Sequence, residues 1–219
     1  DKNELTVKYE VDGNEIKLTP SIVQNYIVGE NNGKITIAEF KFFTELCKAR
    51  KLNPFLREAY CIKYGNQPAA LVVGKDAVLK RAIRHPQYNG RENGVIVQTE
   101  DGEVVERKGA FKLDEEKLVG GWAKVYRKDW EFPTYVSVSL SEAIQTKKDG
   151  EANSNWKNKP ATMIEKVAVV RALRETFIEE LGGMYEAEEM NDELPHETPE
   201  QVEVEIVEQP EPKQAEITM

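Results

Sequence analysis

The sequence predicts an α+β fold in which central antiparallel strands pack with helices, followed by an acidic C-terminal tail. Three observations predict it. Strand-like runs separated by turn residues occupy the middle of the chain, and helical patterns lie before and after them. After Met190 the composition changes: Glu, Pro, Gln and Thr dominate, and no apolar face is sustained. The apolar content of 40% is enough to build a core.

The first part of the chain is expected to hold two hairpins and three helices. The hairpin turns are predicted from Asp12-Gly13-Asn14 and Gly65-Asn66, which favour tight reversals. Thr19-Pro20 and Thr36 favour helix starts, and Asn53-Pro54 and His85-Pro86 favour helix ends. The strands are expected at 5–11, 15–18, 58–64 and 69–73, and the helices at 21–28, 36–50 and 75–84, the second with Phe40, Phe43, Leu46 and Cys47 on its inner face.

The second part of the chain is expected to form the main sheet and a final helix. A short helix from Ser139 or Ser141 to Thr146 and a polar loop over 147–159 separate the strands from that helix. Pro160 suits a first helical turn, and Gly182-Gly183 ends the pattern. The strands are expected at 95–99, 103–111, 121–126 and 134–138.

The final helix carries two arginines within its apolar stripe. At about 100° per residue, its expected core face consists of Met163, Val167, Val170, Phe177, Ile178 and Leu181. Arg174 projects between Met163 and Val167, and Arg171 lies close to that face. Guanidinium groups in such places need anionic partners. Either internal carboxylates, for example Glu58 or Glu165, or external phosphates could supply them.

The negative charge of the chain belongs to its tail. The net charge is −9, but residues 184–219 hold twelve acidic side chains and one lysine, which leaves 27 acidic and 29 basic residues in 1–183. We therefore expect a mildly basic core domain at 1–183 and an acidic segment at 184–219 that is disordered or extended and could bind a partner.

Several function classes are disfavoured. Cys47 and Cys61 lie in segments expected to be buried and lack metal-binding spacing, which favours a reduced, cytoplasmic protein. No apolar run approaches the ~18 residues of a membrane span, and no signal peptide is visible. Motifs of serine hydrolases, zinc proteases and P-loop ATPases are missing from the sequence. Asp101, Glu106 and Lys108 mimic the centre of some metal-dependent nucleases, which leaves a DNA nuclease as the alternative reading.

Basic residues gather in four places, together with aromatic residues. Cations bind phosphates and aromatic rings stack on unpaired bases, so this combination is typical of a single-strand binding groove. The alternative for each cluster taken alone is a solvated charged face. The clusters are Lys75, Lys80, Arg81 and Arg84; Lys124, Arg127 and Lys128 with Trp130; Lys147, Lys148, Lys157 and Lys159 with Trp156; and Lys166, Arg171 and Arg174.

Several sequence blocks, in the same order and spacing, resemble the phage Bet family of Redβ/RecT single-strand annealing proteins. ARKLNPFLREAYCIKYG at 49–65 and VVGKDAVLKRAIRHPQYNG at 72–90 are two of them. AKVYRKD at 123–129 is similar to the basic strand of that family, and the stretch from Trp156 to Phe177 is similar to its last core helix. The resemblance runs from about Thr36 to Gly183.

The resemblance implies a compact α+β core remotely similar to Rad52-type annealing proteins. It implies a non-enzymatic, ATP-independent protein that binds single-stranded DNA and anneals complementary strands during phage recombination in the bacterial cytoplasm. It implies assembly into rings or helical filaments, a partner exonuclease, and contact with the single-strand binding protein of the host. No nucleotide or other cofactor is implied, and a requirement for Mg²⁺ is left open.

The resemblance transfers functional positions only where residues match. Matching basic positions are Arg57, Lys80, Arg127, Lys128 and Arg174, whereas Ala161, Thr162 and Glu165 depart from the bases that relatives carry there. Together with the basic clusters, this gives the residues predicted to contact DNA: Arg57, Lys63, Lys75, Lys80, Arg81, Lys124, Arg127, Lys128, Lys147, Lys148, Trp156, Lys157, Lys159, Lys166, Arg171 and Arg174.

Overall fold

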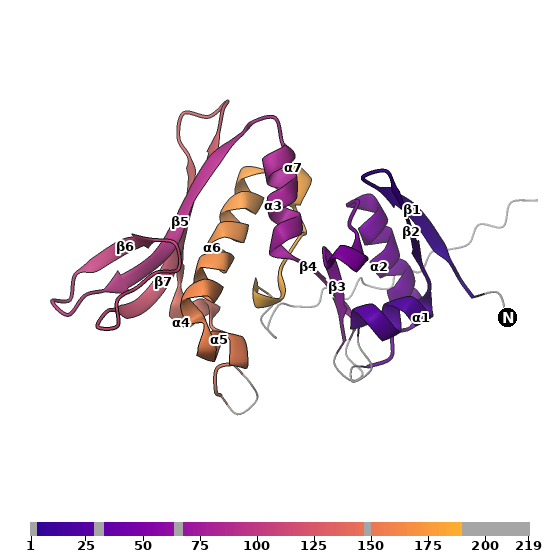
Figure 1. Ribbon diagram of the computed structural model, residues 1–219, viewed down its shortest axis with the longest axis horizontal. Coiled ribbons are helices and arrows are strands. Elements are labelled where there is room, and N and C mark those ends of the chain that lie inside the picture. The colour runs from indigo at the N-terminus through magenta and orange to yellow at the C-terminus, as the bar shows by residue number, and fades with distance from the viewer. Residues whose placement is uncertain (1–3, 29–32, 64–67, 147–149, 190–219) are drawn as a thin grey trace, which may run out of the picture.

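The computed structural model describes residues 4–28, 33–63, 68–146 and 150–189 and confirms the α+β fold. Two lobes are visible in Figure 1: a smaller one that ends at β4 and a larger one built on the main sheet. One cluster of buried apolar side chains extends from Tyr9 to Met184. The two lobes therefore share a hydrophobic core.

The smaller lobe begins with the expected hairpin and two helical segments. Strands β1 (Val7–Val11) and β2 (Asn14–Leu18) pair antiparallel. The turn places Asp12 at φ 50° and Gly13 at φ 79°, as a tight two-residue turn requires. Thr19 caps α1 (Pro20–Ile22), which continues as the π-helical segment η1 (Val23–Val28).

Helix α2 (Ile37–Ala49) begins as predicted, at a capping box. The Thr36 side chain accepts a bond from the Glu39 N–H, and the Glu39 carboxylate accepts one from the Thr36 N–H. A short 3₁₀ turn, η2 (Pro54–Leu56), leads into the antiparallel hairpin of β3 (Ala59–Ile62) and β4 (Ala70–Val73). The predicted turn of that hairpin, Gly65-Asn66, lies outside the described residues.

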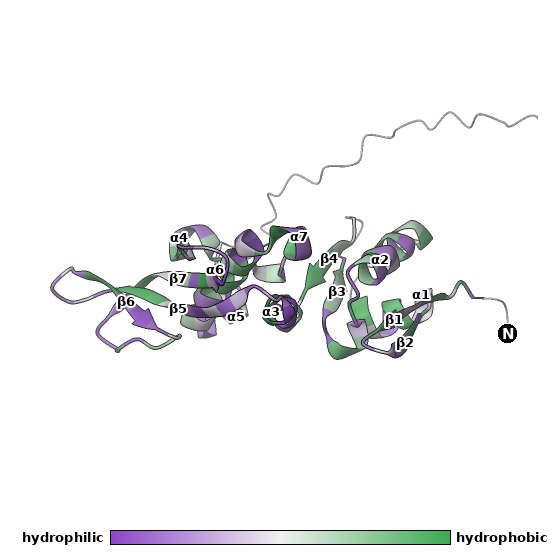
Figure 2. Cartoon of the chain, turned by 90° about the horizontal axis from the view of Figure 1, so that it is seen from above, coloured by the Kyte–Doolittle hydropathy of each residue, from purple (hydrophilic) through white to green (hydrophobic). Residues whose placement is uncertain are grey.

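The larger lobe is a four-stranded antiparallel sheet with helices on one face, as Figure 1 shows. The strand order is β6 (Val104–Lys108), β5 (Tyr88–Gln98), β7 (Lys117–Arg127), β8 (Thr134–Ser139). Strands β5 and β7 are longer than predicted, because their pairing continues beyond the apolar runs. Figure 2 shows the mostly hydrophilic edge strand β6, where charged side chains discourage pairing with another chain.

In the described part of the chain, six helical segments accompany this sheet, and the longest packs directly on it. Gly121 in β7 permits this close approach, because a Cβ atom there would lie 2.6 Å from the carbonyl oxygen of Ile164. The segments are α3 (Lys75–Arg84), α4 (Leu140–Ala143), α5 (Ser154–Asn158), α6 (Pro160–Thr176), α7 (Ile178–Leu181) and the 3₁₀ turn η3 (Ala187–Glu189).

The predicted final helix is wrong in two respects. It does not run to Leu181: Phe177 adopts φ −125° and ψ 56°, which separates α6 from α7. Its apolar side is also not a single stripe, because α6 lies between the sheet and α3 and is buried around most of its circumference. Ile178, expected in the core, is 66% exposed.

The polar loop expected over 147–159 contains helix α5. The Asn153 side chain caps this helix by accepting bonds from the Asn155 and Trp156 N–H groups. Trp156 is only 1% exposed and belongs to the core. A base-stacking role for Trp156 is therefore incompatible with this conformation. Lys147 and Lys148 lie outside the described residues.

The folded part of the chain extends beyond the predicted boundary at Gly183. Residues 184–189, named here the C-terminal strap, pack against α6 of the larger lobe and bond to β4 of the smaller one. Met184 and Glu186 are buried, and the Tyr185 carbonyl accepts a hydrogen bond of 2.8 Å from the Val73 N–H of β4. The first acidic residues of the predicted tail thus belong to the core.

The two cysteines are free thiols, as predicted. Burial raises the pKa of Cys47 to about 12 and that of Cys61 to about 11. Both thiols therefore remain protonated and unreactive at neutral pH. Within the ranges that the structure describes, no helix is long and apolar enough to span a membrane.

Candidate nucleic-acid interface

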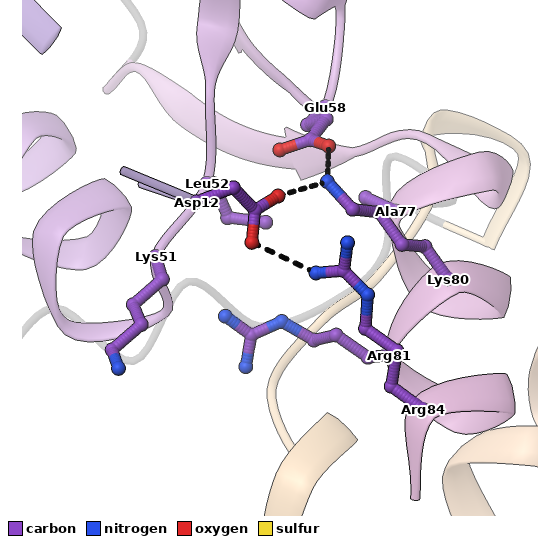
Figure 3. A pocket seen from close by; sticks show the side chains of 8 residues that line it. All are labelled: Asp12, Lys51, Leu52, Glu58, Ala77, Lys80, Arg81 and Arg84. Carbon is purple, nitrogen blue, oxygen red and sulfur yellow. Dashed lines mark hydrogen bonds and ion pairs between the residues drawn. The ribbon is translucent and has the colours of Figure 1, made fainter. Parts of the chain in front are cut away.

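A pocket of about 280 Å³, named here the cationic pocket, lies where the two lobes meet (Figure 3). The β1–β2 turn, the segment after α2 and one side of α3 form its walls. Four of its residues are basic and two are acidic. The lining residues are Asp12, Lys51, Leu52, Glu58, Ala77, Lys80, Arg81 and Arg84.

Asp12 and Glu58 hold two of the four cations in place. The Lys80 Nζ lies 2.7 Å from Asp12 Oδ2 and 2.9 Å from Glu58 Oε1, and Arg84 Nη1 lies 2.9 Å from Asp12 Oδ1. Hydrogen bonds from Lys80 and Arg84 lower the pKa of Asp12 to about 2. The hydrogen bonds of Lys80 to Asp12 and Glu58 raise the pKa of Lys80. These ion pairs bridge the two lobes.

Arg81 makes no ion pair or hydrogen bond through its side chain with any other described residue. It is half-buried in the pocket wall (Figure 3). Burial, and then the neighbouring Arg50 charge, lower the pKa of Arg81. A phosphate placed beside this guanidinium would gain a charge-assisted contact.

Backbone strain is concentrated at this pocket. In the described part of the chain, only three residues other than glycine have positive φ: Asp12 at 50°, Lys51 at 48° and Arg57 at 58°. Two of them line the pocket, and Arg57 precedes the lining residue Glu58. A tight turn accounts for Asp12. Lys51 and Arg57 occupy positions where glycine is the usual residue, and strained backbone often marks functional sites.

Two blocks that resemble the annealing family meet at the pocket. The Gly74 N–H donates to the Glu58 carbonyl at 3.1 Å. A Cβ at Gly74 would lie 2.8 Å from the Arg57 carbonyl oxygen, so glycine is required for this contact. The turn carrying Arg57 therefore abuts the start of α3, where Lys75 lies.

Arg171 and Arg174 have an internal partner, which was one of the two predicted outcomes. The carboxylate of Glu189 in the C-terminal strap lies 2.6 and 3.0 Å from Arg174 Nη2 and Nη1 and 3.9 Å from Arg171 Nε. The examples Glu58 and Glu165 were wrong: Glu58 pairs with Lys80, and Glu165 accepts a hydrogen bond from Asn93. The burial of Arg174 no longer argues for a phosphate partner.

Lys63 and Lys166, two further predicted contacts, are also engaged with carboxylates inside the protein. Lys63 is 6% exposed, and its Nζ lies 2.7 Å from both carboxylate oxygens of Glu39. Lys166 lies 3.5 Å from the buried Glu186 in the C-terminal strap. These lysines stabilise the fold in this conformation, so their predicted contact with DNA would require local rearrangement.

No residue of the basic strand β7 lines the cationic pocket. Lys124 stacks between the rings of Trp122 and Tyr135, with its Nζ 5.2 and 5.1 Å from their centroids. Arg127 is held by Asp129 and by the Thr176 carbonyl. It lines a second pocket, of about 260 Å³, with Trp130, His85 and several glutamates.

Three predicted lysines lie at other surface positions. Lys128 donates to the Pro86 carbonyl, and Lys157 pairs with Glu151. Lys159, at the start of α6, is exposed. Their DNA contacts remain predictions.

Two of the three alternative nuclease residues are engaged with other side chains. Glu106 accepts a hydrogen bond from the Tyr135 hydroxyl, and Lys108 pairs with Glu92 at 2.7 Å. Among the described residues, no group of His, Cys, Asp or Glu could hold a metal ion. The structure therefore gives this alternative no supporting geometry.

The sequence analysis missed part of the pocket. Lys51, Asp12 and Glu58 were not predicted as site residues, and Arg84 was recognised only as part of a basic cluster. The backbone conformation of Lys51 could not be predicted from the sequence. The β1–β2 turn that supplies Asp12 is distant along the chain, and only folding brings it to the pocket. A basic residue next to the Asn53-Pro54 helix break was the only signal in the sequence for Lys51.

The residues that line the cationic pocket, except Asp12, and the blocks around them fall within a family match. The family model described as the RecT family matches residues 13–205, which extends the predicted resemblance on both sides. No curated protein matches the chain. Since this match covers most of the 219 residues, the chain belongs to the RecT family of phage single-strand annealing proteins that act in DNA recombination.

Proposed function

We propose that this protein binds single-stranded DNA through the cationic pocket and anneals it to a complementary strand without ATP. The observation that carries the proposal is the excess of positive charge at the pocket, where Arg81 lacks a carboxylate partner among the described residues. Lys51, Arg57 and Lys75 lie in or beside the pocket and extend the positive surface. Phosphate contacts carry no base information, so binding is expected to be independent of sequence.

Annealing follows from holding a strand by its phosphates. Naked strands repel each other and fold on themselves. A cationic surface that neutralises the phosphates lowers the repulsion, and holding the strand straight opposes its folding on itself. Base stacking, worth about 1.4 kcal/mol per step, then drives pairing, so nucleotide hydrolysis is not required. Subunits in a ring or helical filament would add their weak contacts through effective concentration. The oligomeric form, the exonuclease partner and the contact with the single-strand binding protein of the host are part of this proposal.

Replacing Arg81 with Gln tests the pocket. We expect weaker binding to single-stranded DNA and a salt dependence whose slope falls by about one unit, as expected for one lost phosphate contact. Stability should be preserved, because burial and Arg50 already disfavour the charge of Arg81. Fluorescence anisotropy over a series of salt concentrations measures both quantities, and urea denaturation checks the stability.

Lys112→Gln is the matched control, because Lys112 is half-buried like Arg81 and lies outside both the pocket and every predicted cluster. It removes one charge and should leave the slope unchanged. Equal slopes for the two variants would contradict a phosphate site at Arg81.

An annealing assay tests the proposed activity itself. Two complementary oligonucleotides with donor and acceptor dyes should pair faster when the wild-type protein is added in dilute buffer without ATP. Unchanged pairing kinetics would refute the proposal. Adding Mg²⁺ tests the nuclease alternative, which requires products shorter than the substrate.

A further inference from the structure

An exposed apolar pair stands beside the cationic pocket. Phe55 is 53% exposed and Leu56 is 67% exposed, in the short turn between α2 and β3. Exposed apolar side chains do not gain the favourable free energy that burial away from water would give them. An exposed patch of such side chains commonly marks a binding site. The mechanism proposed above gives this pair no role.

The backbone beneath the pair is fixed by hydrogen bonds. Asn53 Oδ1 accepts from the Phe55 N–H at 3.0 Å, and the Asn53 carbonyl accepts from the Leu56 N–H at 3.1 Å and from the Glu58 N–H at 3.2 Å. The Asn53 N–H donates to Glu58 Oε2 at 2.8 Å. The turn therefore presents both apolar side chains without the entropic cost of ordering the chain on binding.

The ends of the turn are anchored as well. Pro54 is buried, and its carbonyl accepts from the Arg57 N–H at 3.0 Å, which holds Arg57 in its left-handed conformation. The residues that bracket the segment, Leu52 and Glu58, both line the cationic pocket. The apolar pair thus lies at the edge of the cationic pocket, on a turn whose conformation is fixed.

We propose that Phe55 and Leu56 contact the nucleobases of a strand whose phosphates bind in the cationic pocket, with the Phe55 ring stacked on a base. This inference rests on the proposed function. An apolar ring beside paired cations matches a nucleotide, which combines a flat apolar face with an anion. A second copy docking through this same surface would bring two positive patches together, which disfavours a symmetric protein contact.

The full-length protein is tested with oligothymidylate and with an abasic strand of equal length, at low salt. Phe55→Ala should weaken binding of oligothymidylate about tenfold and leave binding of the abasic strand nearly unchanged. Phe55→Trp should restore the affinity, and the fluorescence added by this tryptophan should be quenched by oligothymidylate only. Phe132→Ala is the matched control, because Phe132 is 75% exposed in the β7–β8 connection.

The outcomes separate the inference from the function it rests on. Equal losses with both strands, or no loss with either, would overturn the base contact while leaving DNA binding intact. A change in oligomer mass by light scattering, without a base-dependent loss, would assign the pair to contacts between copies and overturn the inference. If the wild-type protein binds neither strand, the proposed function itself fails. Since both side chains are exposed, the variants should unfold at the urea concentration of the wild type.

Discussion

At the scale of single residues, Lys51 places a cation at the pocket on a strained backbone. It follows the end of α2 at φ 48°, a position where glycine avoids the clash between Cβ and the backbone. Its side chain is exposed and lines the pocket, so it contributes little to the core. Stability sacrificed at a binding site is a common trade-off in proteins.

Lys51→Gly should therefore stabilise the protein while weakening DNA binding. Glycine relieves the backbone strain of the folded state, but it also has greater conformational freedom in the unfolded chain. The net effect should be a gain of roughly 0.5–1 kcal/mol in the free energy of unfolding. Urea denaturation measures this gain, and anisotropy measures the loss of affinity. Lys51→Gln keeps the strain and removes the charge, so it should weaken binding without stabilising. A glycine variant that binds DNA as tightly as wild type would remove Lys51 from the interface.

At the scale of elements, the ion pair between the half-buried Glu39 and the buried Lys63 joins α2 to the β3–β4 hairpin. Glu39 completes the capping box of α2 and also accepts a hydrogen bond of 2.9 Å from the Ala69 N–H. Burial alone would raise the pKa of Glu39, but the bonds from Lys63, Thr36 and Ala69 outweigh it and lower the pKa from 4.5 to about 2. The ionised form of Glu39 is thus much more favourable in the folded state.

This pair should make the protein sensitive to acid. A carboxylate with a lowered pKa in the folded state contributes stability above its ordinary pKa, and this contribution is lost as the pH falls from about 4.5 towards 2. Glu39→Gln should cost about 3 kcal/mol at neutral pH, because it leaves the buried Lys63 without a counter-charge. The variant should also lose stability less steeply in acid, which urea denaturation at several pH values would show.

The control for Glu39 is a surface pair on the same helix. Glu45 and Lys48 lie 4.0 Å apart, and both side chains are more than half exposed. Glu45→Gln should change stability by less than about 0.5 kcal/mol. If the two variants behave alike, the Glu39 pair is not the link between α2 and the hairpin.

At the scale of the whole molecule, ion pairs join the lobes at one site and the strap closes the core at another. Lys80 and Arg84 of α3 bridge to Asp12 of the β1–β2 turn. DNA phosphates that compete for these cations would act at the boundary between the lobes. The C-terminal strap neutralises Arg174 and contributes the buried Met184, so the folded core includes residues beyond Gly183.

Truncation separates the strap from the acidic sequence that follows it. A chain that ends at Glu189 should unfold at the same temperature as the full chain. A chain that ends at Gly183 should lose at least about 3 kcal/mol, because Arg174 loses its carboxylate and the contacts of Met184 disappear. Thermal unfolding measures both variants, and similar midpoints would show that the strap does not stabilise the core.

The chain that ends at Glu189 also tests whether the acidic tail competes with DNA. If the acidic residues after Glu189 compete with DNA for the basic core, the chain that ends at Glu189 should bind DNA more tightly than the full chain. Unchanged affinity would exclude that competition.

Local signals in the sequence determined most of the elements. Turn residues, caps and helix-breaking prolines act within a few residues, so the hairpin at Asp12-Gly13, the capping box at Thr36 and helix α3 were predictable. The blocks that resemble the annealing family were visible in order and spacing, and the family match confirmed them.

Tertiary structure alone decided which charges are free. Arg174 and Lys63 resemble DNA-binding residues in the sequence, but Glu189 and Glu39, distant along the chain, neutralise them in the fold. Trp156 resembles a stacking platform until packing places it in the core. The sequence established the family and the fold class because those depend on local patterns. The site depended on the fold, because an ion pair forms between side chains that only long-range packing brings together.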